Sequence, residues 1–84
     1  MDRKDIERTV KNIIASQLGK SEDDIDNNHN FKNDLYTDNT DSLDAVEILI
    51  LIEDDFDINI SDSDYDDLST VEDLIEYIYE KKNG

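Results

Sequence analysis

The 84-residue sequence contains no cysteine, no proline and no tryptophan, and it has a single histidine. Without cysteine the chain cannot form a disulfide, a zinc–thiolate site or a thiol nucleophile. The lone His29 lies in the polar run DNNHNF, where we expect a solvated loop residue. One histidine cannot supply a histidine-rich metal site. These absences therefore exclude enzymes with a cysteine nucleophile, zinc–thiolate centres and histidine-rich metal centres.

Basic residues are also scarce. Eight Lys and Arg stand against 24 Asp and Glu, which gives a net charge of −16 with the histidine neutral. Nucleic acids and anionic membrane surfaces bind cationic patches, so neither is expected as a partner. Basic protein surfaces are the natural partners of such a chain. The same charge repels itself in a compact fold, which predicts that low salt destabilises the protein.

The sequence lacks a long apolar run at its start. The opening segment MDRKDIERTV has neither the features of a signal peptide nor those of a membrane span. We therefore expect a cytoplasmic protein without a membrane span. The length predicts one small domain, residues 1–84, whose small core leaves it marginally stable.

Helical spacing of apolar residues occurs in several segments, and no run with the alternation of a β-strand stands out. The first segment runs from Asp5 to Leu18 and is followed by Gly19, a residue type that commonly ends helices. The second runs from Ser42 to about Phe56. Asp41 is its predicted N-cap and Asp44 its third residue, where carboxylates favour the positive end of the helix.

Two further helices are predicted after the second. A short one opens at Ser61 or Asp62 and runs through Asp67, and a last one is capped by Thr70 with Asp73 three residues on. Residues 26–40 form a long polar connection, and loops of that length are usually functional or mobile. The prediction is an all-α fold, a small four-helix bundle with a long loop between helices 1 and 2 and a short third helix.

The second predicted helix carries apolar residues on two faces. With a rotation of about 100° per residue, one set falls within a single arc that is typical of a core face. Its members are Ala45, Ile48, Leu49, Ile52 and Phe56. The opposite side holds an apolar strip with carboxylates beside it, namely Leu43, Val46 and Ile50 with Glu47, Glu53 and Asp54.

Two interpretations of the second strip are open. The bundle could bury this helix on all sides, as larger proteins do with a central helix. An 84-residue chain has few elements with which to cover both faces, so we favour an exposed docking strip. In that interpretation the apolar residues supply affinity and the acidic rim attracts basic partners.

Ser42 stands at the head of this helix. A catalytic serine needs a base, usually histidine, and an oxyanion hole, but the only histidine lies in a loop-like run. Asp41 and Asp44 flank Ser42, and negative neighbours disfavour an alkoxide or an oxyanion. We therefore expect Ser42 to be modified by another enzyme. A phosphodiester there would be favoured by the helix dipole and opposed by the two aspartates.

Several motifs follow one another along almost the whole chain. They are VKNIIASQLG in the first helix, F-x-x-D-L at residues 31–35, DSLDAVE at 41–47, EDDFDINI at 53–60, LSTV at 68–71 and I-x-Y-I at 75–78. DSL alone would be a weak signal. The ordered set, in a short acidic chain, resembles the acyl carrier proteins of dissociated, type II fatty-acid synthesis.

This resemblance implies that Ser42 carries 4′-phosphopantetheine, transferred from coenzyme A by a separate holo-synthase. Growing fatty acyl chains would be held on that arm as thioesters, and the carrier, a monomer with no specific metal site, would catalyse nothing itself. Basic patches on the holo-synthase and on fatty-acid synthesis enzymes would dock on Asp41, Leu43, Asp44, Val46, Glu47, Ile50, Glu53 and Asp54. The acyl-chain pocket would be lined by Ile48, Leu49, Ile52, Phe56, Leu68 and Ile75.

The sequence departs from the family pattern before the serine. Residues 36–40 place five residues between Leu35 and Asp41, where the family usually has two, and the usual glycine is absent. A specialised carrier for another acyl, polyketide or aminoacyl pathway therefore stays open. So do two other classes: a phosphorylation switch at Ser42, and an acidic module that binds divalent cations through Asp62-x-Asp64-x-Asp66.

Overall fold

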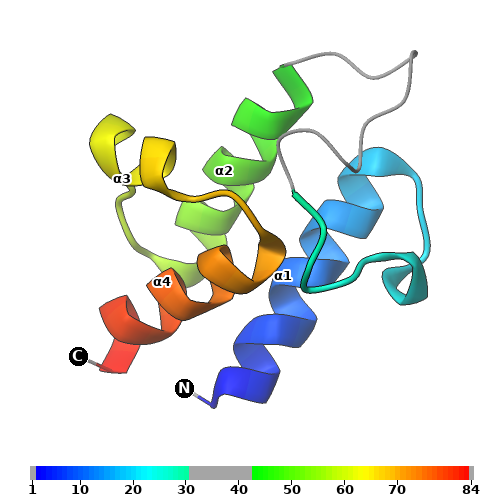
Figure 1. Cartoon of the computed structure of the whole chain (residues 1–84), viewed down its shortest axis with the longest axis horizontal. Helices are drawn as coiled ribbons and strands as arrows, with labels where there is room; N and C mark the ends of the chain where they lie inside the picture. Colours follow the sequence, from blue (N-terminus) through cyan, green and yellow to red (C-terminus); the bar gives the residue numbers. More distant parts are fainter. Residues whose placement is uncertain (1, 31–42, 84) are drawn as a thin grey trace.

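The computed structural model describes residues 2–30 and 43–83, and for residues 43–46 it describes the backbone alone. The described chain is helical, as the sequence predicted (Figure 1). No described helix has the length and apolar character needed to cross a membrane. The elements in chain order are α1 (Arg3–Leu18), the 3₁₀ turn η1 (Glu22–Asp24), α2 (Leu43–Phe56), α3 (Asp62–Asp67) and α4 (Val71–Asn83).

Helix α1 is the hub of the bundle, because its backbone packs closely against α2, α4 and η1. It begins at Arg3, two residues before the predicted start, and Gly19 ends it in the left-handed conformation with φ 67°. The amide of Lys20 donates to the carbonyl of Ala15 at 2.8 Å, which closes the last turn. The predicted second helix is described from Leu43 on, and its predicted end at Phe56 is confirmed.

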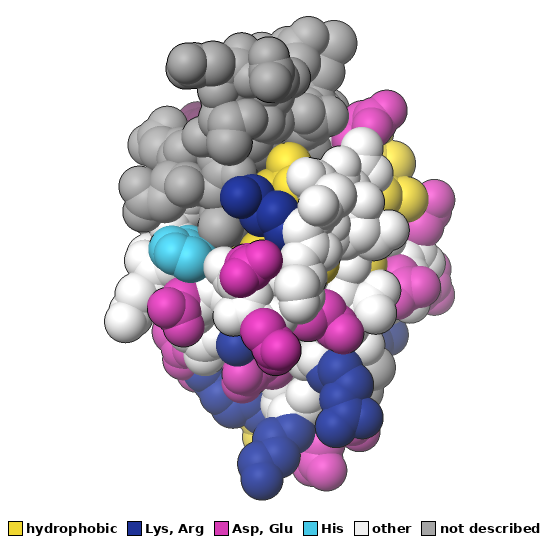
Figure 2. Space-filling view, turned by 90° about the vertical axis from the view of Figure 1, so that its right-hand side faces the viewer, with side chains coloured by type: hydrophobic (Ala, Val, Ile, Leu, Met, Phe, Trp, Pro, Cys, Tyr) yellow, Lys and Arg dark blue, Asp and Glu magenta, His cyan; other side chains and the backbone are white. Residues whose placement is uncertain are grey.

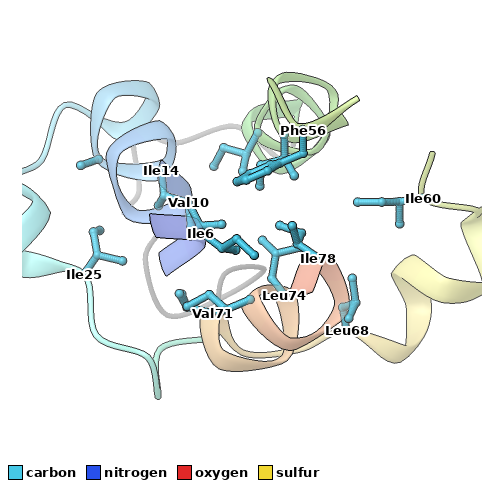
Figure 3. Packing of buried hydrophobic residues seen from close by; sticks show 14 residues of the cluster. Ile6, Val10, Ile14, Ile25, Phe56, Ile60, Leu68, Val71, Leu74 and Ile78 are labelled. Carbon is cyan, nitrogen blue, oxygen red and sulfur yellow. The ribbon is translucent and has the colours of Figure 1, made fainter. Parts of the chain in front are cut away.

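The core lies between α1, α2 and α4, and every buried residue in the described chain is apolar. Figure 3 shows Ile6 of α1, Phe56 of α2 and Leu74 of α4 pointing toward one another. Residues on either side of the short α3 close the edge of this cluster. The full set is Ile6, Val10, Ile14, Ala15, Ile25, Ile48, Ile52, Phe56, Ile60, Leu68, Val71, Leu74, Ile75 and Ile78.

Side-chain caps start the last two helices where the sequence predicted them. The Ser61 hydroxyl accepts from the amide of Asp64 at 3.1 Å, which opens α3. Thr70 and Asp73 form a reciprocal capping box at the start of α4: the Thr70 hydroxyl accepts from the Asp73 amide at 3.1 Å, and the Asp73 carboxylate accepts from the Thr70 amide at 3.2 Å. Local sequence therefore determines these helix starts.

His29 is more than the solvated loop residue that the sequence suggested. It is partly buried, and its Nδ1 accepts a hydrogen bond from the amide of Asp26 at 3.0 Å. Its carbonyl accepts from the amide of Val71, and the carbonyl of Asn27 accepts from the amide of Glu72, both at 2.9 Å. The start of the long connection is thus fastened to the first turn of α4, whose orphan amides it satisfies.

A tyrosine ties α3 to α4. The Tyr77 hydroxyl donates to the Asp64 carboxylate at 2.7 Å, and Lys81 lies over the Tyr77 ring at 5.4 Å. Burial, this hydrogen bond and the negative charges of Asp64 and Glu53 raise the pKa of Tyr77 to about 12. The contact therefore depends on a protonated phenol.

We expect this contact to be lost at high pH. An unfolded tyrosine has a pKa of about 10, so the stability that Tyr77 contributes is fully present below about pH 10 and disappears as pH rises toward 12. Tyr77→Phe should cost about 1 kcal/mol at pH 8 and flatten this alkaline loss. Urea unfolding between pH 8 and 11.5 measures how the free energy of unfolding of each variant depends on pH. Tyr79→Phe, on the exposed side of α4, is the control, and an equal slope in both variants would contradict the assignment.

Asp57 follows α2 in the left-handed conformation, with φ 55°, where a glycine is usual. The amide of the next residue, Ile58, donates to the carbonyl of Glu53 at 3.1 Å, so the turn is a closed helix end. This left-handed conformation was not predictable from the residue type, because the position carries neither glycine nor asparagine.

We expect Asp57→Gly to raise the free energy of unfolding by about 1 kcal/mol, because glycine adopts positive φ without a Cβ penalty. Thermal and urea unfolding measure the change. Asp57→Ala separates the two causes, because it removes the carboxylate but keeps the Cβ that opposes positive φ. A gain of the same size in Asp57→Ala would show that loss of charge, and not relief of backbone strain, is responsible.

Candidate functional site

The inner face of α2 fixes what its outer face presents. Ile48, Ile52 and Phe56 are buried and Leu49 is partly buried against the core, so the helix can adopt only one rotation. That rotation leaves Ile50 half exposed. Glu47 and Asp54, two of the predicted docking residues, are exposed as well.

The other predicted site residues lie at or beyond the start of the described helix. Asp41 and Ser42 lie outside the described residues, as do residues 31–35 with their F-x-x-D-L motif. Leu43, Asp44 and Val46 are described as backbone in the first turn of α2, and their roles stay predictions. Ser42 directly precedes Leu43 in the sequence.

Leu51 is an exposed residue that the helical pattern did not single out. It is 41 % exposed, although it lies in the middle of an apolar run. Its position, one residue after Ile50, turns it toward α1, outside both the core arc and the predicted strip. A signal was present in the sequence, because the run ILILI holds more apolar residues than one core face can use.

A shallow groove of about 200 Å³ lies where α1 and α2 meet at the surface, lined by Gln17, Glu47, Ile50 and Leu51. The Gln17 side-chain amide donates to the Glu47 carboxylate at 2.5 Å, which links the two helices. The groove therefore combines an apolar floor with a carboxylate at its edge.

Glu53 has a partner within the fold. Its carboxylate accepts from the amide of Ile60 at 2.9 Å and so fastens the segment between α2 and α3. The predicted docking set thus contains two kinds of acidic residue. Glu53 stabilises the fold through its hydrogen bond to the Ile60 amide, whereas Asp54, the next residue, is exposed.

Charge is divided unequally over the molecule. No Lys or Arg occurs between Lys32 and Lys81, so the described part of α2 and all of α3 carry acidic charge alone. Figure 2 shows the face of the molecule that lies on the right in Figure 1, and on this face the Lys and Arg side chains gather mostly in the lower half. Arg3 of α1 forms ion pairs with Glu72 and Glu76 of α4. A cationic partner is therefore attracted to α2 and α3.

The six residues predicted to line an acyl-chain pocket all belong to the core or pack against it. Five are buried, and Leu49 is partly buried. An acyl chain would have to part them. Another hollow, of about 570 Å³, lies between α1 and the segment around η1. Ile25 is the one apolar residue in its lining, so that hollow does not suit an acyl chain.

The aspartates that suggested a calcium loop lie on a helix. Residues 62–67 form α3, and the Asp64 carboxylate accepts the Tyr77 hydroxyl. An EF-hand needs an extended loop that turns its oxygens inward, and a helix does not provide one. Within residues 2–30 and 43–83, no three His, Asp or Glu side chains are grouped as metal ligands.

A comparison with protein families matches residues 8–78 to the family described as phosphopantetheine attachment site. The match begins within α1 and ends within α4, and it includes the DSL motif at the head of α2. The chain belongs to the phosphopantetheine attachment family. It is a carrier protein whose cofactor is a covalently attached 4′-phosphopantetheine. Carrier domains of this family generally hold acyl chains for synthase enzymes and are not themselves catalytic.

The described residues fit this cofactor. Helix α2 is described from Leu43, the residue after the motif serine, and the start of a helix favours a phosphodiester. The cofactor supplies a thiol, which this cysteine-free chain lacks. The exposed acidic face of α2 is suited to basic enzymes that must reach such an arm.

The two kinds of acidic residue on α2 can be separated by stability. We expect Glu53→Ala to lower the free energy of unfolding by about 1–2 kcal/mol, because the Ile60 amide loses a charged acceptor. Asp54→Ala, one residue away and exposed, should change it by less than about 0.5 kcal/mol. Urea unfolding of both variants in one buffer makes the comparison. Equal losses would contradict the structural role of Glu53.

Proposed function

We propose that this protein is a cytoplasmic acyl carrier protein, with residues 1–84 as one carrier domain. It carries growing fatty acyl chains as thioesters on 4′-phosphopantetheine at Ser42 and presents them to the enzymes of fatty-acid synthesis. The observation that carries the proposal is the family match over residues 8–78, which includes the DSLDAVE motif at the head of α2.

Ser42 is the proposed attachment residue. Its hydroxyl oxygen attacks the β-phosphorus of coenzyme A on a holo-synthase, the proton passes to that enzyme, and adenosine 3′,5′-bisphosphate leaves. Support comes from the motif and from the helix that follows it, whose first-turn amides favour the resulting phosphodiester. The flanking Asp41 and Asp44 offer the basic synthase a negative surface beside the reacting hydroxyl.

The two faces of α2 have different roles in the carrier: the buried face packs the core and the outer face meets partners. Ile48, Ile52 and Phe56 hold the bundle closed and part to admit an acyl chain. The described core has no buried polar side chain that would hold these helices in a single arrangement. A net charge of −16 also opposes tight packing. Both features favour a bundle that opens at low cost.

The pathway is inferred from sequence. The acidic α2 and the D-S-L-D motif favour fatty-acid synthesis, while the longer connection at residues 36–40 favours a specialised acyl, polyketide or aminoacyl carrier. Acyl-transfer assays that compare malonyl-loading enzymes of fatty-acid and polyketide systems distinguish them.

Modification at Ser42 is tested by incubating the protein with coenzyme A, magnesium and a broad-specificity phosphopantetheinyl transferase, then recording the intact mass. We expect one phosphopantetheine on the parent and on Ser63→Ala, an exposed serine in α3, and none on Ser42→Ala. The same Ser42→Ala result with a phosphate-sized mass on the parent after isolation from cells would favour the phosphorylation switch. An unmodified but folded parent, with transferases of more than one lineage, would contradict the carrier function.

A further inference from the structure

Helix α3 packs against the core less tightly than the other helices do. None of its residues is buried, and it takes no part in the close backbone packing that joins α1 to α2, α4 and η1. Ile60 and Leu68, which flank α3, are the most exposed members of the core at 7 % and 6 % (Figure 3). A guest molecule displaces least where packing is least complete. The α3 edge is therefore the part of the described core that yields most easily.

The α1–α4 side of the core is closed more firmly. Ile6 and Val10 of α1 have no exposed surface. Arg3 forms an ion pair with Glu72, and the Asn27 side-chain amide donates to the same carboxylate at 2.8 Å. These polar links join α1, the start of the long connection and α4. An acyl chain that enters the core is therefore expected at the α3 edge.

Tyr65 is the one large side chain on α3, because the rest of the helix consists of Asp and Ser. Its ring is partly buried and packs against the core. Burial raises the pKa of the Tyr65 phenol, and the negative charge of Asp66 raises it further. The Tyr65 carbonyl accepts from the Leu68 amide at 3.1 Å. One turn of backbone therefore sets Tyr65 and the predicted pocket residue Leu68 at the same edge of the core.

The ring of Tyr65 occupies space that an acyl chain would need. A buried tyrosine covers about 150–250 Å², and one methylene group corresponds to about 30 Å² of apolar surface. A partly buried ring therefore takes the place of about three or four methylene groups. A chain that reaches this point must move a rigid ring into water or leave its own end there. Both outcomes remove the gain from further methylene groups.

We propose that Tyr65 limits the length of the acyl chain that this carrier shelters, so that its cargo consists of short and medium acyl groups. The inference rests on the proposed carrier function and names the substrate class of that function. Tyr65 is a specificity-determining residue here, because its ring meets the end of the cargo and not the reacting atoms. Longer chains can be attached to the arm, but their ends stay exposed.

Thermal unfolding of carriers loaded with acyl chains of known length tests this limit. A broad-specificity phosphopantetheinyl transferase moves acyl-phosphopantetheine from acyl-coenzyme A of four to sixteen carbons onto Ser42, and intact mass confirms each product. We expect the Tm of the parent to rise by about 1–3 °C for each sheltered methylene group and to stop rising at or below ten carbons. Retention on a hydrophobic-interaction column should begin to increase at the same length, because further methylene groups are exposed.

Variants at Tyr65 separate the ring from its hydroxyl. Tyr65→Ala should move the limit by about two to four carbons toward longer chains, because it removes the ring. Tyr65→Leu also removes the ring, should move the limit in the same direction, and replaces Tyr65→Ala if that variant does not fold. Tyr65→Phe keeps the ring, so its limit should equal that of the parent. Tyr79→Ala, which removes an exposed ring from α4, is the matched control.

The outcomes separate the length limit from the carrier function. An unchanged limit in the ring-free variants, with Ser42 loaded, would overturn the role of Tyr65 and leave the carrier function standing. An equal shift in Tyr65→Phe or Tyr79→Ala would also overturn it. A parent Tm that rises through sixteen carbons, or at no length, would overturn the assignment to short and medium chains. A parent that no transferase loads would overturn the carrier function, and this inference with it.

Discussion

The packing of one stripe of α2 against α1 and α4 determines the rest of the molecule. Ile48, Ile52 and Phe56 are fully or almost fully buried, and they recur every four residues. Once this stripe is in place, helical geometry alone turns Glu47, Ile50 and Leu51 to the surface. The rotation of α2 therefore determines both the fold and the proposed docking surface. A change of helix rotation that exposed the stripe would also remove the surface that partners meet.

Repulsion between acidic side chains opposes this packing, and the uneven placement of the basic residues leaves one face acidic. The chain has a net charge of −16, and the basic residues lie mainly on α1 and at the end of α4. Arg3 and Lys11 form the described ion pairs, so they offset acidic charge near α1 and α4 and leave α2 and α3 acidic. Hydrogen bonds replace ion pairs around α3, where Asp64 accepts from Tyr77 and Glu53 accepts from the Ile60 amide. The acidic face thus stays free to attract cationic enzymes over long distances.

Local sequence signals predicted much of the fold. The Ser61 cap, the Thr70–Asp73 capping box and the glycine after α1 are local in sequence, and the structure confirms each. Features that depend on distant neighbours were not predictable in this way. His29 gains its role from Val71 of α4, 42 residues further along the chain. The left-handed Asp57 is a local feature, but its residue type did not signal that conformation. Leu51 was missed because it falls between the core arc and the opposite apolar strip of α2, on neither face that the pattern defined. The attachment residue itself was inferred from motif and chemistry.

We infer that partners meet the carrier on the α2 face and not on the basic end of the bundle. A titration of the ¹⁵N-labelled protein with a catalytically inactive phosphopantetheinyl transferase, followed by amide chemical shifts and line widths, tests this inference. We expect the changes to concentrate at Glu47, Ile50, Leu51 and Asp54, to extend to Gln17 on α1, and to weaken with salt. Changes that instead centre on Arg8 and Tyr79, with α2 unaffected, would contradict it.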